Sequence, residues 1–219
     1  MQDYLEVTGM VLKAVPVLEM DKRITILTKE RGKISAFARG ARKPGSRFMA
    51  ATNPFCYGVF RLYEGKTAYN LAEVKADTYF ESLREDYEGA FYGMYFADVA
   101  DYYTRENNDE KEMLKLLYAS LKALGISSIS NELVQYIFEM KTLTVNGEFP
   151  GVIASHALHD STKYCIEFVR QSPIEKLYTF TVSDEVLRQL AAECEYYRTK
   201  YIVHKFKSLD ILENCRLKN

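Results

Sequence analysis

The spacing of the hydrophobic residues changes near residue 77, and this change constrains the fold more than any other feature of the sequence. Up to that point, short apolar runs alternate with polar residues, as in "RITILT", where Ile24 and Ile26 share one face of a strand. Beyond it, apolar residues recur at helical spacing. The pattern predicts an α+β chain with two domains: a β domain over 1–76 and an all-α domain over 77–219.

The β part divides into five runs with strand character and one long connection. Gly, Pro, Ser and Asn fill the connection over 40–54, where we expect a loop with one helical turn at 47–51. Five short strands with one longer connection predict a small closed barrel of the oligonucleotide-binding (OB) type. The predicted strands span residues 5–19, 23–28, 33–39, 55–65 and 67–76.

The second part divides into helices bounded by polar or glycine-containing stretches. The predicted helices span residues 82–107, 107–125, 131–147, 160–171, 172–180 and 183–206. In the fifth, Ser172, Pro173 and Glu175 form a capping-box pattern. The first helix is expected to pack one apolar stripe inward, made of Leu83, Tyr87, Ala90, Phe91, Met94 and Ala97.

Positive charge is concentrated in the barrel. From Arg31 to Tyr63 there are seven basic residues and no Asp or Glu, whereas the rest of the chain holds 22 basic and 30 acidic residues. The formal net charge of -1 therefore conceals a basic segment within an acidic protein. Such segments are typical of surfaces that bind polyanions.

This basic segment predicts a surface for single-stranded nucleic acid, on which cations neutralise phosphates and aromatic rings stack on bases. The predicted phosphate contacts are Arg31, Lys33, Arg39, Arg42, Lys43 and Arg47. The stacking candidates are Phe37, Tyr57 and Phe60, although strand aromatics more often lie in the core. A solvated loop whose charge serves only solubility is the alternative interpretation, but solvated surfaces usually mix both signs of charge.

Stretches near both ends of the sequence resemble a known family. The stretch "MDKRITILTKERGKISAFARGARKPGSR" is similar to the start of RecO, the bacterial recombination mediator. The stretches "SPIEKLYTFTVSDEVLRQL" and "HKFKSLDIL" resemble the C-terminal helices of the same family. The resemblance thus covers both ends of the chain, and the helical middle is compatible in length.

The resemblance implies an N-terminal OB barrel, a helical domain without catalytic chemistry, and no enzymatic activity. It also implies binding of single- and double-stranded DNA, annealing of complementary strands, and help in loading recombinase at gaps. The partners that it implies are the single-stranded-DNA-binding protein and RecR. The family's basic loop maps by motif onto Arg39, Arg42, Lys43 and Arg47.

The sequence departs from the family at one place. Many members carry a four-cysteine zinc module after a segment like "NGEFP", but here only about ten residues separate Pro150 from the next predicted helix, and no Cys-x-x-Cys pair is present. We therefore expect no metal and no other cofactor. His156, His159 and Cys165 are the only residues near this place that could retain a metal, and a zinc site needs three or four ligands.

Two other functions remain open at this stage. A nucleic-acid enzyme anchored by the barrel would need clustered carboxylates for its metal ions or a phosphate-binding loop, and neither pattern is found. A scaffold that binds an acidic peptide is the other alternative, because cations serve both kinds of partner. Its candidate site lies in "YIVHKFKSL", with the basic residues Lys200, His204, Lys205 and Lys207.

The sequence offers no secretory signal and no apolar stretch of the roughly 20 residues that a membrane span needs. We expect a cytoplasmic, nucleoid-associated protein with reduced cysteines and no contact with a membrane. On its own we expect it to be a monomer.

Overall fold

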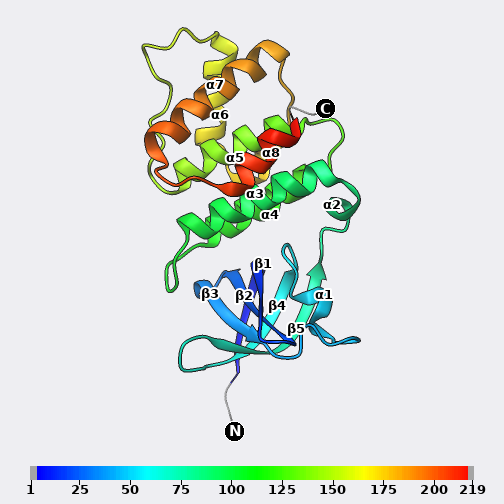
Figure 1. Cartoon of the computed structure of the whole chain (residues 1–219). Helices are drawn as coiled ribbons and strands as arrows, with labels where there is room; N and C mark the ends of the chain where they lie inside the picture. Colours follow the sequence, from blue (N-terminus) through cyan, green and yellow to red (C-terminus); the bar gives the residue numbers. More distant parts are fainter. Residues whose placement is uncertain (1–3, 217–219) are drawn as a thin grey trace. The chain divides into compact units, whose positions relative to one another are not determined.

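The computed structural model describes residues 4–216 (Figure 1). The chain divides into two compact units, each of which is described by itself. The first contains the residues up to Glu85 together with Ala97–Leu114, and the second contains Asp86–Phe96 and the residues from Lys115 onward.

Five strands form a closed barrel in the order β1-β2-β3-β5-β4. The strands are β1 (Leu5–Val17), β2 (Asp21–Thr28), β3 (Gly32–Ala38), β4 (Tyr57–Tyr63) and β5 (Tyr69–Thr78). The ring is closed by an antiparallel pairing of β1 with β4, while β3 and β5 run parallel and pair through only two residue pairs. The predicted five-stranded OB-like barrel is therefore confirmed, and its one short helix, α1 (Phe48–Ala51), lies where a helical turn was expected.

Alternation along the strands decides which side chains fill the barrel. In β3, Ile34, Ala36 and Ala38 are buried, whereas Ser35 and Phe37 face outward and are only half-buried. The interior is apolar and includes Val7, Val11, Ile24, Ile26, Ile34, Phe60 and Leu62. The outward faces of β2 and β3 are thus free to carry polar and charged groups.

The first unit also includes the loop of residues 104–110. Gly32 begins β3 with a φ of +64°, and a Cβ at this position would lie 2.2 Å from the backbone oxygen of Arg105. The backbone N–H of Lys33 donates to the same oxygen over 3.0 Å. Only glycine permits both the positive φ and this close approach, so it fixes the start of β3 against the loop.

Seven α-helices follow the barrel within the described residues. They are α2 (Ser82–Glu85), α3 (Tyr87–Tyr103), α4 (Lys111–Ala123), α5 (Asn131–Val145), α6 (Asp160–Gln171), α7 (Asp184–Tyr201) and α8 (Lys207–Arg216). Side-chain caps mark two of their starts: Ser130 accepts from the N–H of Leu133 before α5, and Ser183 accepts from the N–H of Val186 before α7.

The predicted helix over 82–107 is wrong in its continuity, and its predicted apolar stripe is correct only in part, since Leu83 and Ala97 are buried. It is split between α2 and α3 at Asp86, whose carboxylate accepts from the N–H of Gly89 over 3.0 Å. Tyr87 and Met94, expected inside, are 81% and 48% exposed. Packing against α5 selects the other face of α3 instead, since the ring of Phe96 stacks on that of Phe138 at 4.3 Å.

Two further helix predictions need correction. The capping box at Ser172 does not form, because Ser172 follows the end of α6 and only a 3₁₀ turn, η1 (Ile174–Lys176), comes after Pro173. The predicted helix over 183–206 ends at Tyr201, and α8 begins at Lys207. The β-branched pair Ile202 and Val203 disfavours helix here, and the ring of Phe206 packs on Tyr95 with centroids 5.7 Å apart.

Buried polar groups tie the helices of the second unit together. Nη1 of Arg198 on α7 donates to both carboxylate oxygens of Glu139 on α5, over 2.9 and 2.7 Å. The hydroxyl of Tyr95 donates to the same carboxylate. Lys141 donates to three backbone oxygens at the end of α6, those of Val169, Arg170 and Ser172. These bonds compensate the charges of Glu139 and Lys141, both of which are buried away from water.

Candidate nucleic-acid interface

The basic loop, which we define as residues 39–47, connects β3 to α1 at one rim of the barrel. Gly40 adopts a φ of +66°, and its N–H donates to the carboxylate of Asp21 over 2.8 Å. The N–H of Lys43 then donates to the Gly40 oxygen, closing a tight turn. The loop therefore has a defined backbone path.

A second set of contacts fastens the basic loop to the turn between β1 and β2. The N–H of Arg42 donates to the backbone oxygen of Met20 over 2.9 Å, and its guanidinium donates to the backbone oxygen of Glu19 over 3.1 Å. The β1–β2 turn is one of the places at which OB barrels bind oligonucleotides. The loop and the turn thus form one continuous surface.

Four cations of the basic loop are exposed: Arg39, Arg42, Lys43 and Arg47. Arg47 donates to the backbone oxygen of Ala72 on β5 over 2.8 Å, and its guanidinium carbon lies 4.8 Å from the centre of the Phe48 ring. Among the described residues no carboxylate forms an ion pair with any of the four, although Glu19 and Asp21 are near in the fold. Their charges remain available to an anion.

Arg31 and Lys33 lie at the other end of β3, which is seven residues long, so roughly 20 Å separates them from the loop. Lys33 forms an ion pair of 2.9 Å with Asp101 and also donates to the Asp101 backbone oxygen. Arg31 is exposed, and its backbone oxygen accepts from the N–H of Asn107. The structure does not bring these two residues together with the loop, and the charge of Lys33 is already compensated.

A seventh cation of the acid-free stretch is also compensated. Arg61 on β4 forms ion pairs with Glu6 on β1 at 2.9 Å and Glu73 on β5 at 3.0 Å. Acidic side chains therefore do lie beside this stretch in the fold, because the neighbouring strands supply them.

The three stacking candidates differ in exposure. Phe60 is fully buried in the barrel core, so it has no face on which a base can stack and is no longer a candidate. Tyr57 is half-buried at the start of β4. Phe37 faces outward on β3, two residues before the basic loop. Of the three rings, that of Phe37 is the one adjoining the free cations.

Two cations of β2 were not among the predicted contacts, and one of them, Arg23, lies beside this ring. Arg23 pairs with Phe37 in the β2–β3 register, its guanidinium carbon is 5.9 Å from the ring centre, and its Nε donates to Ser35 over 2.7 Å. Lys22 donates to the side chain of Asn53, and its pKa is lowered by partial burial and by the nearby charge of Arg42. Strand register could have revealed both residues, since the β2–β3 hairpin pairs Lys22 with Ala38 and Arg23 with Phe37.

The cations near the C-terminus belong to the second unit. The ammonium group of Lys200 donates to the hydroxyl of Tyr196 and lies 5.2 and 5.8 Å from the ring centres of Tyr196 and Tyr201. The ring of His204 packs on Phe206. Lys205 and Lys207 are exposed, on either side of Phe206.

The possible metal ligands have other partners. Nδ1 of His156 lies 2.6 Å from the carboxylate of Glu193, and Nε2 of His159 lies 3.8 Å from that of Glu185. Cys165 is buried. Within residues 4–216 no group of three or more His, Cys, Asp or Glu side chains is arranged to hold a metal ion. Over the same residues no helix has the length and apolar composition to cross a membrane.

Comparison with known proteins is consistent with this geometry. Residues 1–80 match the family described as Recombination protein O N terminal, and residues 84–152 match Recombination protein O C terminal. The chain is 28% identical to the "DNA repair protein RecO" of Clostridium perfringens (strain 13) over 95% of its own length and 97% of the relative's. It is likewise 28% identical to that of Acetivibrio thermocellus, over 96% and 97%. With the protein of the same name from Bacillus subtilis (strain 168) it shares 32% identity over 69% of this chain and 58% of the relative.

Proposed function

The chain belongs to the RecO family of DNA repair proteins, a non-enzymatic family with a mediator role in recombination, and from this premise we propose that it binds single-stranded DNA along the basic loop. The binding surface, which we call the rim surface, consists of Arg23, Phe37, Arg39, Arg42, Lys43 and Arg47. The observation that carries the proposal is the set of exposed cations without carboxylate partners beside one outward-facing ring.

Binding of this kind is independent of base sequence. Guanidinium and ammonium groups neutralise phosphates, which every strand carries at regular intervals. One ring, Phe37, is placed to stack on a base, and stacking tolerates any base because all have a π-face. The proposed surface therefore suits a protein that acts wherever a gap leaves a strand exposed.

The same chemistry supports annealing. Because the strand is held mainly through its phosphates, the pairing edges of most bases stay free for a complementary strand. The phosphates of the duplex that results can still contact the rim surface, so binding of double-stranded DNA belongs to the proposal. Helping to load recombinase at gaps, as the family's mediator role implies, follows as a further part of it.

The remaining parts of the proposal rest on the family alone. One is interaction with the single-stranded-DNA-binding protein and with RecR. Another is a cytoplasmic location at the nucleoid. The third is a division into a DNA-binding domain of residues 1–76 and a helical domain of residues 77–219. Co-purification of each partner with the tagged full chain tests the two interactions.

A salt titration tests the DNA site. Anisotropy of a labelled single strand should give a log K that falls with log salt at a slope of about -3 to -4, for four to six phosphate contacts. Replacing Arg42 and Lys43 together by Ala should flatten the slope by about 1 to 1.5 and weaken all base sequences alike. An unchanged affinity and slope in the double variant would place the DNA elsewhere.

The matched control is a variant that should lose no phosphate contact. Arg61→Ala removes a cation that two carboxylates already neutralise, so its slope should equal that of the parent protein. Replacing Arg39, Arg42, Lys43 and Arg47 all by Ala should shift stability by no more than about 0.5 kcal/mol per site, because exposed side chains contribute little to folding. Thermal unfolding of this variant separates loss of binding from loss of fold.

A further inference from the structure

Two tyrosine rings lie against each other on the outside of the barrel, beyond the rim surface. Tyr4 directly precedes β1 and Tyr63 ends β4, and the centroids of their rings are 4.4 Å apart. The hydroxyl of Tyr63 donates to that of Tyr4, which holds the two rings together. Tyr4 is 56% exposed and Tyr63 is half-buried. These two residues, which we call the tyrosine pair, are therefore accessible to a ligand.

Strand register places the tyrosine pair in one row with Phe37. Phe37 on β3 pairs with Asn70 on β5, and Asn70 pairs with Tyr63 on β4. Tyr63 then contacts Tyr4. Residues that lie opposite each other in register share one face of a sheet. Here it is the outer face, because Leu62, which precedes Tyr63, is buried in the barrel core.

The row has the length of a short piece of DNA. Neighbouring strands lie about 4.8 Å apart, so the two steps from Phe37 to Tyr63 span about 10 Å. Nucleotides of one strand in B-form DNA follow each other at about 3.4 Å along the axis. A single strand that stacks one base on Phe37 can therefore stack another on the tyrosine pair about three nucleotides further along.

The tyrosine pair offers rings without a free charge beside them. Glu6 and Glu73 lie near the pair on the outer face, but Arg61 forms ion pairs with both. The turn between β4 and β5 carries one residue of each sign, Glu64 and Lys66. A phosphate is thus neither strongly attracted nor strongly repelled here, so binding at this end of the row depends on the bases.

Rings of this kind distinguish a single strand from a duplex. An unpaired base can turn its face to an aromatic side chain, and this stacking tolerates any base. In a duplex both faces of each base are covered by the neighbouring base pairs, and exposing one requires unstacking. Phosphates, in contrast, are exposed in both kinds of DNA.

We propose that the tyrosine pair is a second stacking site for single-stranded DNA, which reaches it from the rim surface by way of Phe37 and Asn70. The pair adds affinity for single strands and none for duplexes, whereas the cations of the rim surface serve both. This inference rests on the proposed DNA binding along the basic loop and extends its path across β5 and β4.

Anisotropy titrations of the full chain test the proposal with two probes, an oligothymidylate of about 12 nucleotides and a duplex of the same length. Tyr4→Ala and Tyr63→Ala should each weaken binding of the single strand about fivefold or more, and binding of the duplex less than about twofold. The slope of log K against log salt should stay that of the parent in both variants, because no phosphate contact is lost.

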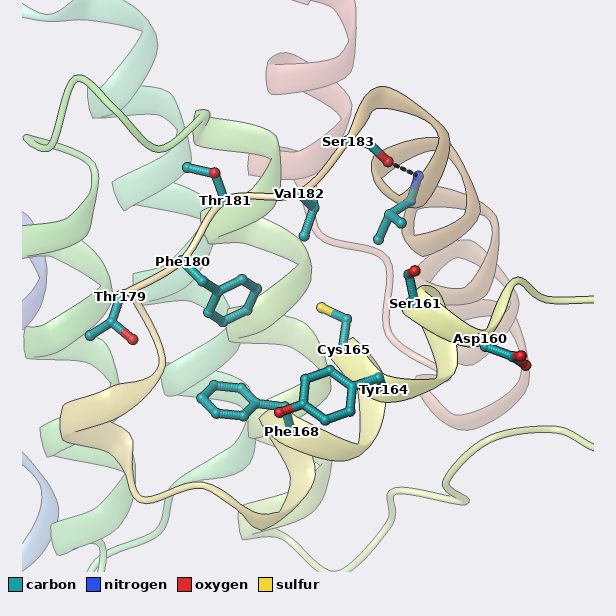
Figure 2. A pocket seen from close by; sticks show the side chains of 11 residues that line it. Asp160, Ser161, Tyr164, Cys165, Phe168, Thr179, Phe180, Thr181, Val182 and Ser183 are labelled. Carbon is teal, nitrogen blue, oxygen red and sulfur yellow. Dashed lines mark hydrogen bonds between the residues drawn. The ribbon is translucent and has the colours of Figure 1, made fainter.

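Two control variants separate stacking from other effects. Tyr4→Phe keeps the ring and should bind the single strand like the parent. Tyr164→Ala removes a ring from the second unit that is 73% exposed and lies beside Phe168 (Figure 2), and it should leave both affinities unchanged. Thermal unfolding checks each variant. Since Tyr4 lies before the first strand, Tyr4→Ala still tests the proposal if Tyr63→Ala destabilises the barrel.

Photo-crosslinking locates the contact directly. An oligothymidylate with 5-iododeoxyuridine at one position, moved along the strand in a series, should crosslink to Tyr4 or Tyr63 at some positions and to Phe37 at others. Mass spectrometry of the digested protein identifies the crosslinked residue. Crosslinks confined to the rim surface overturn the proposal.

The outcomes also separate this inference from the proposed function. If the double replacement of Arg42 and Lys43 by Ala weakens binding but neither tyrosine variant does, the rim surface stands and the second stacking site is wrong. That result is also expected if the pair contacts a protein instead of DNA. Equal losses for single strand and duplex overturn the inference as well. If none of these variants loses affinity, both proposals are wrong.

Discussion

Lys33 and Asp101 form an ion pair of 2.9 Å across 68 residues of sequence, and this pair takes one cation of the acid-free stretch out of the DNA-binding set. The side chains are 22% and 34% exposed. The pair joins the start of β3 to the last turn of α3 within the first compact unit. Its contribution is to the fold, and the free cations that lie together are those of the basic loop at the opposite rim.

We therefore expect Lys33→Ala to affect stability and not the salt dependence of DNA binding. The slope of log K against log salt should match that of the parent, while the free energy of unfolding falls by about 1 kcal/mol for a partly exposed pair. Anisotropy titrations and urea denaturation measure the two quantities on one sample. If the slope of log K against log salt is flatter in Lys33→Ala than in the parent, Lys33 does contact a phosphate and this prediction is wrong.

Phe37 should contribute to affinity without contributing charge. Phe37→Ala should weaken single-strand binding by about 1–3 kcal/mol for one stacked base and leave the salt slope unchanged. Tyr57→Ala provides the comparison, since Tyr57 is half-buried at the start of β4. Equal losses in the two variants would argue against a particular role for the ring beside Arg23.

The sequence was sufficient to predict the barrel because each strand carries its own signal. Ile24 and Ile26, or Ile34 and Ala36, alternate with outward residues, and glycine and polar residues mark the turns. The basic loop was found for the same reason, since its charges are contiguous. What local patterns do not contain is the partner of each charge: nothing near Lys33 in sequence indicates Asp101.

The helical part was harder to predict because packing partners decide its details. Several faces of α3 are apolar, and contact of Phe96 with Phe138 selects one of them. Likewise, Ser172 and Glu175 have the spacing of a capping box, but Ser172 follows the end of α6. The break after Tyr201 carries no glycine or proline, and its position depends on the burial of Phe206.

The Glu139–Arg198 pair should be a strong determinant of stability. Arg198→Met leaves the carboxylate of Glu139, which is 4% exposed, without its cation, and should cost about 3–5 kcal/mol. Arg188→Ala removes an exposed pair with Glu185 on the same helix and should cost less than about 1 kcal/mol. Urea denaturation of both variants tests the contrast, and similar losses would contradict it.

Alkaline pH should destabilise the protein in part through Cys165. Burial raises the pKa of its thiol from 9.0 to about 11, so the unfolded chain loses this proton first as pH rises. The stabilisation is complete below about pH 9 and is lost toward pH 11, with a ceiling of about 2–3 kcal/mol. The free energy of unfolding at pH 8 and at about pH 10.5 measures the loss. Cys165→Ala should show a smaller decline, and an equal decline in both proteins would exclude this cause.

Protein purified without chelators should contain no stoichiometric zinc. His156 already contacts Glu193, His159 lies near Glu185, and Cys165 is buried. Within residues 4–216 the three side chains do not form a group that could hold a metal ion. Elemental analysis gives the answer directly. About one zinc per chain would overturn the prediction, and loss of that zinc in His156→Ala would identify a ligand.

The parallel seam between β3 and β5, with its two residue pairs Ala36–Tyr69 and Phe37–Asn70, is the least connected join of the barrel. Local fluctuations that break hydrogen bonds start where fewest must break together. Amide hydrogens along this seam should therefore exchange with solvent through partial openings, well before those of the β1–β2 hairpin, which exchange only on complete unfolding. Phe37 lies on the β3 side of the seam, and Arg47 contacts β5 on the other side. A DNA strand bound to both residues would therefore oppose opening of the seam. DNA binding should then slow deuterium uptake at the amides of Tyr69 and Asn70.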